Sequence, residues 1–555
     1  MTAYNNVTLS LWALFGALVL YLLTVPGRRG KHLPPGPPTL PIIGNLHQMP
    51  TRKAYLKLAE WAKQYGDMYS FKIGSTTTIV LSNRRLVKEI LERRSVISAG
   101  RPAVYGLEKL VFGGHFILLQ QPDAPMYRIS KKLLHQYFGE PAIDRSHLRI
   151  INAEATQLIR DLMVDPENFP HHAHRYANSF TMSTSESVRT HGKNTPLKYL
   201  AYGIRTPSHD TPHLTAITKI TAQATSLIAP GRLPPVDVFP FLKLVPERIL
   251  GNWVTLCTNL GKASDKLYMS ILESVIERRK TKAPRDTFAD RCLDNKEYEF
   301  SLHELMYLTG AVLDAGTDTT SSVLITLIQM LCAYPDCLKR AHAEIDMVVG
   351  DERTPVWDDF AKLPYINQLM KETQRIRPAT PISFPHKVLE DIWIDGKLLP
   401  KGATIIANVT GLHSDPNKFK HPGEFHPDHY EGMQKLAQGY ANTADENKRD
   451  HYAYGFGRRI CAGMQIAERS LFTTFSKVLW AFDISAPKDA QGRPVAMNLD
   501  PMTGYTEGTI VMPKPFKACI KVRSERRRET ILREFEEAEN NVFAQFDLPK
   551  IGEGI

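Results

Sequence analysis

The sequence is poor in cysteine and has neither low-complexity segments nor an obvious linker. Its six cysteines, spread over 555 residues, cannot form the disulfide framework of a small secreted protein, and reduced thiols facing the cytosol fit them best. Cys332 and Cys337 lie close together, but no further cysteine or histidine nearby completes a zinc site. No Ser/Gly-rich break occurs between about residues 50 and 520, so one large domain is a better interpretation than the several that length alone suggests.

Long uncharged apolar runs are also scarce, but residues 7–25 form one that is long enough to cross a bilayer core. Residues 1–6 carry no charged side chain, whereas three basic residues follow the run, namely Arg28, Arg29 and Lys31. The positive-inside rule then places the terminus in the lumen and the body in the cytosol. A cleaved signal peptide would have a positive start and a shorter apolar run. We therefore predict a single-pass signal anchor over residues 1–27, in the endoplasmic reticulum membrane.

The remaining chain divides into three parts by composition. Residues 28–50 are rich in proline and predict a stiff, extended hinge. Residues 51–523 form the predicted main domain, in which residues 68–82 read as a β-hairpin and helical periodicity dominates from there on. Residues 524–555 are charged and helix-prone without an apolar stripe, which predicts a solvated C-terminal tail.

Residues 186–200 are unexpectedly polar between two apolar, helix-compatible stretches. We interpret this segment as an insertion that forms a surface loop, or as a mis-spliced piece of the gene.

The net charge of +11 suits an acidic protein partner and an anionic membrane equally well. The basic residues are scattered rather than interleaved with aromatic residues, so nothing indicates nucleic-acid binding.

A glycine-rich stretch over residues 451–464 is centred on Cys461. Its glycines, Gly455, Gly457 and Gly463, allow positive φ and a close approach to a flat ligand. A helix-forming run follows, and a thiolate at the start of a helix is favoured by the amide dipoles and by cationic neighbours. Arg459 could pair with an anionic group of the same ligand. A metal held by one thiolate beside an arginine indicates haem, and the alternative is that Cys461 is a small buried residue.

The longest predicted helix covers residues 301–334, ends before Pro335 and is apolar nearly all round in its second half, so we expect it to be buried. Its middle nevertheless carries a polar cluster over residues 315–322. Unpartnered buried polar groups cost roughly 1–3 kcal/mol each, so this cluster needs a reason. Gly316 would let a ligand approach the backbone, Thr319 could hold a water, and Asp318 could pass protons inward. The alternative is that the hydroxyls bond to carbonyls one turn back.

These motifs, together with Glu372 and Arg375 at helical i, i+3 spacing, resemble those of the cytochrome P-450 superfamily. Tyr454, Gly457, Arg459, Cys461 and Gly463 resemble its haem-binding loop, Phe-x-x-Gly-x-Arg-x-Cys-x-Gly, with Tyr454 in place of the usual phenylalanine. Residues 315–320 resemble its oxygen-activation motif, and the proline-rich hinge is similar to that of microsomal members. The resemblance covers roughly residues 7 to 520.

The resemblance implies a mainly α-helical haem-thiolate fold with a small β-rich lobe, preceded by one transmembrane helix. Cys461 would be the axial ligand of haem b, while Thr319 and Asp318 would act in oxygen activation and proton relay. The implied activity is that of a monooxygenase that receives NADPH electrons from a membrane reductase, with cytochrome b5 as a further possible partner.

Further haem contacts follow from the resemblance alone. Tyr127 and Lys131 stand where a Trp-x-x-x-Arg pair of the superfamily binds a haem propionate, although a solvated basic helix face is the alternative. His386 resembles a second propionate contact. Glu372 and Arg375 would lock the cysteine loop, and His429 replaces the arginine that normally completes this lock, which would make it weaker or pH-sensitive.

The substrate pocket is expected from residues 105–119 and 379–384, where Lys109 is the one basic residue that stands out, so a neutral substrate is favoured. Residues 227–250 resemble a loop that dips into the membrane, with buried core as an equal alternative. Residues 202–207, 425–430 and 458–461 look most like filamentous-fungal members of secondary metabolism, some of which hydroxylate small phenols such as cresols. A small hydrophobic substrate, aromatic or polyketide-derived, is the resulting expectation.

Two other classes stay open. A haem-thiolate isomerase or dehydratase needs no reductase, but such proteins tend to lose the pair that Asp318 and Thr319 form here. A non-catalytic haem-binding membrane protein would explain Cys461 but not the buried polar cluster.

Overall fold

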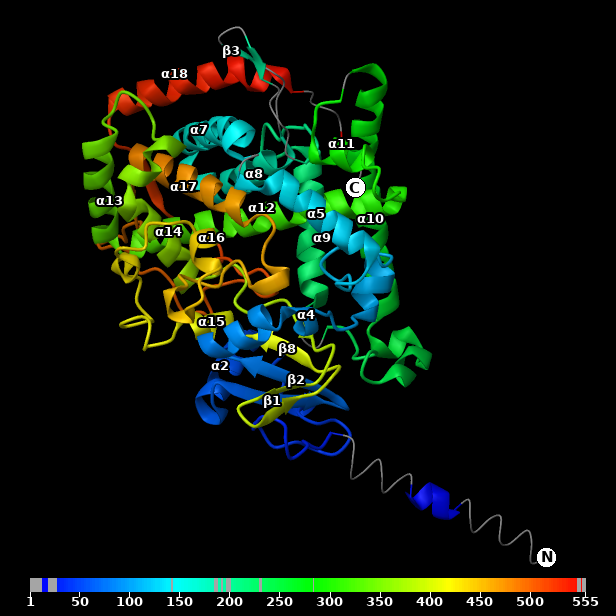
Figure 1. Cartoon of the computed structure of the whole chain (residues 1–555). Coiled ribbons are helices and arrows are strands. Elements are labelled where there is room, and N and C mark those ends of the chain that lie inside the picture. Colours follow the sequence, from blue (N-terminus) through cyan, green and yellow to red (C-terminus); the bar gives the residue numbers. More distant parts are fainter. Residues whose placement is uncertain are drawn as a thin grey trace, which may run out of the picture.

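The computed structural model describes residues 12–17, 27–140, 143–183, 188–190, 193–195, 201–228, 232–282, 284–546 and 551. Helices make up most of the body, and the strands of the main sheet gather at one end of it (Figure 1). The predicted mainly α-helical fold with a small β-rich lobe is confirmed.

The helices follow one another along the whole described chain. The longer ones are α2 (Ala54–Tyr65), α5 (Pro125–Phe138), α7 (Leu148–Val164), α8 (Phe169–Met182), α9 (Pro212–Ile228), α10 (Trp253–Thr281), α12 (Leu302–Ala333), α13 (Pro335–Val348), α14 (Pro364–Ile376), α17 (Met464–Ala481) and α18 (Glu525–Asn541). The short ones are α3 (Arg84–Val87), α4 (Ser95–Ser98), α11 (Phe288–Leu293), α15 (Val409–His413) and α16 (Ala437–Ala441).

A four-stranded sheet with the order β1-β2-β8-β5 forms the β-rich lobe. Its strands are β1 (Met68–Ile73), β2 (Thr76–Leu81), β8 (Thr404–Ala407) and β5 (His386–Lys387). The predicted hairpin over residues 68–82 is confirmed, because β1 and β2 pair antiparallel and Gly74 makes the turn with φ of 56°. Strand β5 carries His386, so the sheet positions one of the predicted haem contacts.

The other strands form two-stranded pairs. They are β3 (Val188–Thr190) with β4 (Lys193–Thr195), β6 (Ile392–Ile394) with β7 (Lys397–Leu399), and β9 (Phe482–Ser485) with β10 (Cys519–Val522). The first pair is the described part of the polar segment 186–200, and it lies at the outer edge of the molecule in Figure 1. The rest of that segment lies outside the described residues.

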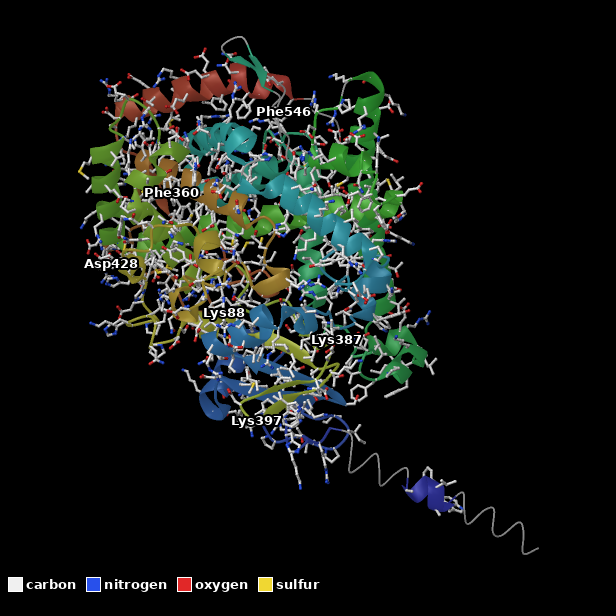
Figure 2. All side chains as sticks on the ribbon, in the orientation of Figure 1. Lys88, Phe360, Lys387, Lys397, Asp428 and Phe546 are labelled. Carbon is white, nitrogen blue, oxygen red and sulfur yellow. The ribbon has the colours of Figure 1, made fainter. Side chains whose placement is uncertain are left out.

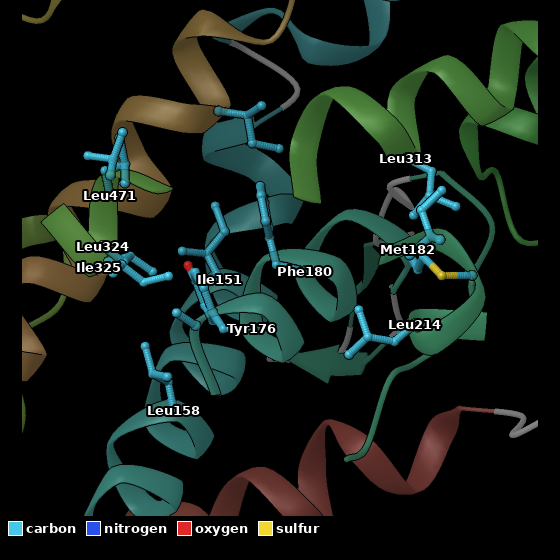
Figure 3. Close-up of a cluster of buried hydrophobic side chains, with 14 of the residues drawn as sticks. Ile151, Leu158, Tyr176, Phe180, Met182, Leu214, Leu313, Leu324, Ile325 and Leu471 are labelled. Atoms are coloured by element: carbon cyan, nitrogen blue, oxygen red, sulfur yellow. The ribbon is translucent and has the colours of Figure 1, made fainter. Parts of the chain in front are cut away.

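Helix α12 runs through the centre of the molecule (Figure 1). A capping box begins it, in which the Glu304 amide donates to the Ser301 hydroxyl and the Ser301 amide donates to the Glu304 carboxylate. Most of its side chains are buried, in an apolar cluster shared with α7, α8 and α17 (Figure 3). The predicted buried helix over residues 301–334 is confirmed, and it gives the polar cluster a rigid support.

The expected solvated C-terminal tail is wrong for α18, which packs along α7. Val542 and Phe543 form a small buried cluster with Ile150 of α7. Glu534 accepts a hydrogen bond from the Thr354 amide at 2.8 Å, and its carboxylate lies 3.7 Å from the buried Lys477 ammonium. The apolar face of α18 consists of few residues among many charges, which is why the sequence pattern did not reveal it.

The N-terminal segment reaches the sheet through its prolines. The Ser70 amide of β1 donates to the Pro35 carbonyl at 2.7 Å, and Arg29 donates to the Gly36 carbonyl at 2.8 Å. Residues 12–17 form a helical turn away from the body (Figure 1), and the rest of the predicted anchor lies outside the described residues. Among the described residues no single helix has both the length and the apolar character to span a membrane, although α12 and α13 pass that test together as a pair bent by 107°.

Candidate active site

The loop that carries Cys461 ends where α17 begins. The Cys461 amide donates to the Tyr454 carbonyl at 2.9 Å, which closes the loop, and Gly463 is the N-cap of α17. Two of the predicted glycine positions have positive φ, Gly455 at 73° and Gly457 at 57°. A Cβ at Gly457 would lie 2.0 Å from the Leu91 carbonyl oxygen, so this glycine serves close backbone packing rather than contact with a ligand.

The thiol of Cys461 has a raised pKa, in contrast to the lowered value that the sequence suggests. Desolvation by the surrounding protein raises the pKa, and a hydrogen bond from the Gly463 amide opposes this only in part. The residue is nevertheless exposed, so it is not the small buried residue of the alternative. Arg459 does not neutralise the sulfur, because it donates to the carbonyls of Ala99 at 3.0 Å and Gln120 at 2.6 Å. A coordinated metal ion would deprotonate such a thiol outright.

The polar cluster of α12 is arranged differently from the prediction at one residue. Gly316 faces α8 and not a ligand, since a Cβ there would lie 2.4 Å from the Thr181 hydroxyl oxygen and 2.9 Å from its methyl carbon. The Thr319 hydroxyl donates to the Ala315 carbonyl, one helical turn earlier, at 2.7 Å. This is the alternative interpretation of the polar cluster, in which hydroxyls bond to carbonyls of the same helix. Ala315 is exposed although Leu313 and Thr317 beside it are buried, so this face of the central helix borders open space.

Asp318 lies beside the same space and is mostly buried. Its carboxylate oxygen lies 3.9 Å from Nε2 of His174 on α8. Burial raises the pKa of Asp318, and His174 opposes this rise. An upward shift of the pKa favours the protonated carboxyl, which is the direction that a proton relay requires.

A basic cluster, defined as Arg101, Tyr127, Lys131, His386 and Arg459, brings together all four predicted propionate contacts. The Arg459 guanidinium lies 4.1 Å from the centre of the Tyr127 ring. Lys131 donates to the Arg458 carbonyl at 2.6 Å, and Tyr127 approaches the same oxygen at 3.4 Å.

Arg101 was missed by sequence reasoning, because a single arginine after a short apolar run has no local signal. It donates to the carbonyls of Leu118 at 2.9 Å and Pro385 at 2.6 Å. Burial and the neighbouring Arg459 lower its pKa to about 9. Burial, Arg101 and Arg459 likewise lower the pKa of His386 to about 3, and His386 donates to the Ser98 carbonyl at 2.9 Å.

This donor set fits haem. Among the described residues, neither Arg101 nor Arg459 has an acidic partner within ion-pair distance. The buried guanidinium of Arg101 and the half-buried one of Arg459 therefore repel each other until an anion joins them. Two carboxylates of a propionate-bearing ligand would satisfy them. The single thiol of Cys461 would then bind the metal of the same ligand.

The predicted lock behind the loop is present. Arg375 binds Glu372 through two bonds of 2.7 Å and donates to the His413 carbonyl at 2.8 Å. His413 in turn accepts from the Tyr452 amide at 2.8 Å, two residues before Tyr454, which connects the pair to the cysteine loop. His429 takes the third place, 3.2 Å from the Glu372 carboxylate.

Comparison with known proteins agrees with this geometry. A family model described as Cytochrome P450 matches residues 34–519. The chain is 42% identical over 545 residues to cytochrome P450 monooxygenase macC of Penicillium terrestre, covering 97% of this chain and 98% of that protein. It is 41% identical over 529 residues to cytochrome P450 monooxygenase yanC of Aspergillus niger, covering 94% and 95% of the two. A solved zebra fish cytochrome P450 with abiraterone matches the fold with a TM-score of 0.64, at 21% identity over 85% of this chain and 100% of that one.

Proposed function

Since the chain belongs to the cytochrome P450 family and is a monooxygenase, we propose that it hydroxylates or oxidises a small aromatic or polyketide-derived intermediate of fungal secondary metabolism. The observation that carries the proposal is the thiol of Cys461 together with the basic cluster, whose two arginines have no acidic partner among the described residues. Relatives of the chain are fungal monooxygenases. Haem held by these residues supplies the activation of O2, with electrons that come from NADPH through a separate reductase.

The residues of this chain have separate tasks in that reaction. Cys461 would bind the iron, and the basic cluster would fix the orientation of the ring through its propionates. Ala315 leaves room beside the reacting position, and the Asp318 carboxyl, whose pKa is raised by burial, would pass protons toward it. The hydroxyl of Thr319 stays on the same face of α12, one turn from Ala315.

The charge of the pocket segments supports a neutral substrate. Lys109, the basic residue of residues 105–119, forms an ion pair with Glu108 at 3.2 Å. Residues 379–384 carry no charged side chain. Phe384 at their end is exposed and lies beside the basic cluster, because Arg101 donates to its carbonyl at 3.2 Å. A segment that has an exposed aromatic ring and no charged side chain of its own suits a small phenol.

The exposed apolar residues support a membrane position. Leu244 and Ile249 are 87% and 74% exposed, and Phe241 beside them is 61% exposed. They lie in two short helical turns, Pro240–Leu244 and Glu247–Leu250, within the predicted membrane loop of residues 227–250. Such a patch suits insertion into the lipid interface, with the predicted anchor over residues 1–27 holding the body at the endoplasmic reticulum membrane.

A depression of about 550 Å³ reaches Cys461 from the protein surface and suits a reductase. Its basic lining residues are Lys88, Arg93, Lys131, His135 and Arg458. The one acidic residue of the lining, Glu92, forms an ion pair with Lys88 at 2.7 Å (Figure 2 labels Lys88). The lining contains no residue of α12, so an acidic electron donor, the reductase or cytochrome b5, could bind here without entering the substrate side.

The test begins with the carbon monoxide difference spectrum of the reduced protein in microsomes, beside Cys461→Ala. We expect a strongly red-shifted Soret band in the parent and none in the variant. Microsomes are then given m-cresol, NADPH and reductase, and we expect a product heavier by one oxygen atom. A rearranged product formed without NADPH would favour the isomerase class, and a well-folded parent without a haem signal would refute the function.

A further inference from the structure

We propose that His174 of α8 is a proton-relay partner of Asp318, which returns a proton from solvent to the Asp318 carboxyl each time that carboxyl gives one up toward the reaction space. The proposal concerns the monooxygenase reaction itself and does not depend on which substrate is oxidised. It assigns a role to a residue that no sequence motif marks.

The hydrogen bonds of His174 determine which nitrogen faces Asp318. Nδ1 lies 2.8 Å from the Pro170 carbonyl oxygen. A carbonyl only accepts, so Nδ1 carries a hydrogen and donates it. Nε2 is therefore the atom that gains and loses a proton, and it is the atom that lies 3.9 Å from the Asp318 carboxylate.

The distance suits proton exchange rather than a permanent ion pair. At 3.9 Å the two atoms are too far apart for a direct hydrogen bond, and one bridging water or a small side-chain movement closes the gap. Asp318 has no other ion-pair partner within 4.0 Å in the part of the chain that the structure describes. Its side chain is 13% exposed and that of His174 is 18% exposed, so water reaches both groups.

Helix packing fixes this pairing. The side-chain amide of Asn178 donates to the Thr317 hydroxyl at 3.2 Å, one turn beyond His174 on α8. Gly316 allows the close approach to Thr181 at the next turn. These two contacts hold α8 against α12, which is why His174 and Asp318 face each other.

The proton balance of the step is simple. Protonated His174 gives the hydrogen on Nε2 to the Asp318 carboxylate, which has just released its own proton. Neutral His174, with its hydrogen kept on Nδ1, then takes a proton from solvent at Nε2. No electron moves, and both groups return to their starting state.

Other titratable groups surround His174. His171 lies one turn earlier on α8, and its ring centre is 5.7 Å from that of His209. His172 faces away, since Nε2 of its ring approaches the Asp165 carbonyl at 2.9 Å. Burial, His209 and His174 all lower the pKa of His171, which disfavours a proton on that ring. His174 is the histidine whose Nε2 lies next to the Asp318 carboxylate.

The experiment measures NADPH oxidation by the holoenzyme with its reductase and without added substrate. His174→Gln should slow it several-fold, increase its solvent isotope effect and remove its fall with rising pH, while the carbon monoxide spectrum stays unchanged. In the Asp318→Asn background, His174→Gln should have no further effect, because both changes remove the same relay. Equal rates and pH profiles in the parent and His174→Gln would overturn the proposal, and so would additive effects of the two changes.

Discussion

The histidine in the lock behind the cysteine loop gives the protein a stability that depends on pH. Nδ1 of His429 lies 3.2 Å from the Glu372 carboxylate, and Nε2 lies 2.6 Å from the Lys420 carbonyl. Both partners only accept hydrogen bonds, so both nitrogens must donate and the ring must be protonated. His429 thus replaces the arginine of the family lock as a cation, and not as the neutral ring that the sequence alone allows.

The sign of the pH effect follows from its pKa. Burial lowers the pKa of His429, but the hydrogen bond and charge of Glu372 and the Lys420 carbonyl outweigh it, and the net shift is upward. The stabilisation is therefore complete below the pKa of an unfolded histidine, about 6.5. It is lost as the pH rises through the raised folded-state pKa, when one of the two charge-assisted bonds disappears. Such a bond contributes about 2 kcal/mol, or about 2 °C in Tm for a domain of this size.

His429→Arg should remove this dependence, because arginine stays protonated throughout. We expect the Tm of the haem-loaded protein to fall by about 2 °C more in the parent than in His429→Arg between pH 6 and pH 9. His426→Gln is the matched control, since only the backbone amide of His426 binds Glu372, at 2.8 Å. Parallel pH profiles of Tm for the parent and His429→Arg would refute the reasoning.

Three further predictions follow from the packing. Arg101→Leu should lower the haem-to-protein ratio several-fold without unfolding the apoprotein, as measured by the Soret absorbance and circular dichroism; full haem occupancy would remove Arg101 from the site. Gly316→Ala should cost about 1–3 kcal/mol by overpacking against Thr181, and Thr181→Ala should restore most of it in urea denaturation. Phe543→Ala should cost about 3 kcal/mol and lower the thermal midpoint, because the ring is buried and its centre lies 3.3 Å from the Arg205 guanidinium. An unchanged midpoint would mean that the segment after α18 does not stabilise the fold.

The sequence predicted those features that local residues encode. Helix α12 has its capping box and a terminal proline within the chain itself, and the loop of Cys461 has its glycines. The features that it missed are made by distant segments. Arg101 reaches Pro385, and Gly316 faces Thr181, so the purpose of each residue appears only once the helices and the sheet are packed.

The packing of the C-terminal helix α18 also depends on a distant segment. A helix with many charges looks solvated when its few apolar residues are counted against the whole helix. Helix α18 needs only a few buried apolar residues, because α7 supplies the rest of the cluster, including Ile150 and Ala153. Where a partner surface is already apolar, a weak stripe is enough, and a single sequence does not reveal that partner.

The docking of α18 also sets the order of events during synthesis. About 360 residues separate the end of α7 from the start of α18, so a ribosome needs roughly 20–70 s to make the chain between them. During that time the side of α7 with Ile150 and Ala153 has no cover, and it is open to chaperones and to other nascent chains. Helix α18 therefore covers this side of α7 late in synthesis, and any partner fused after it must leave residues 525–543 free to dock.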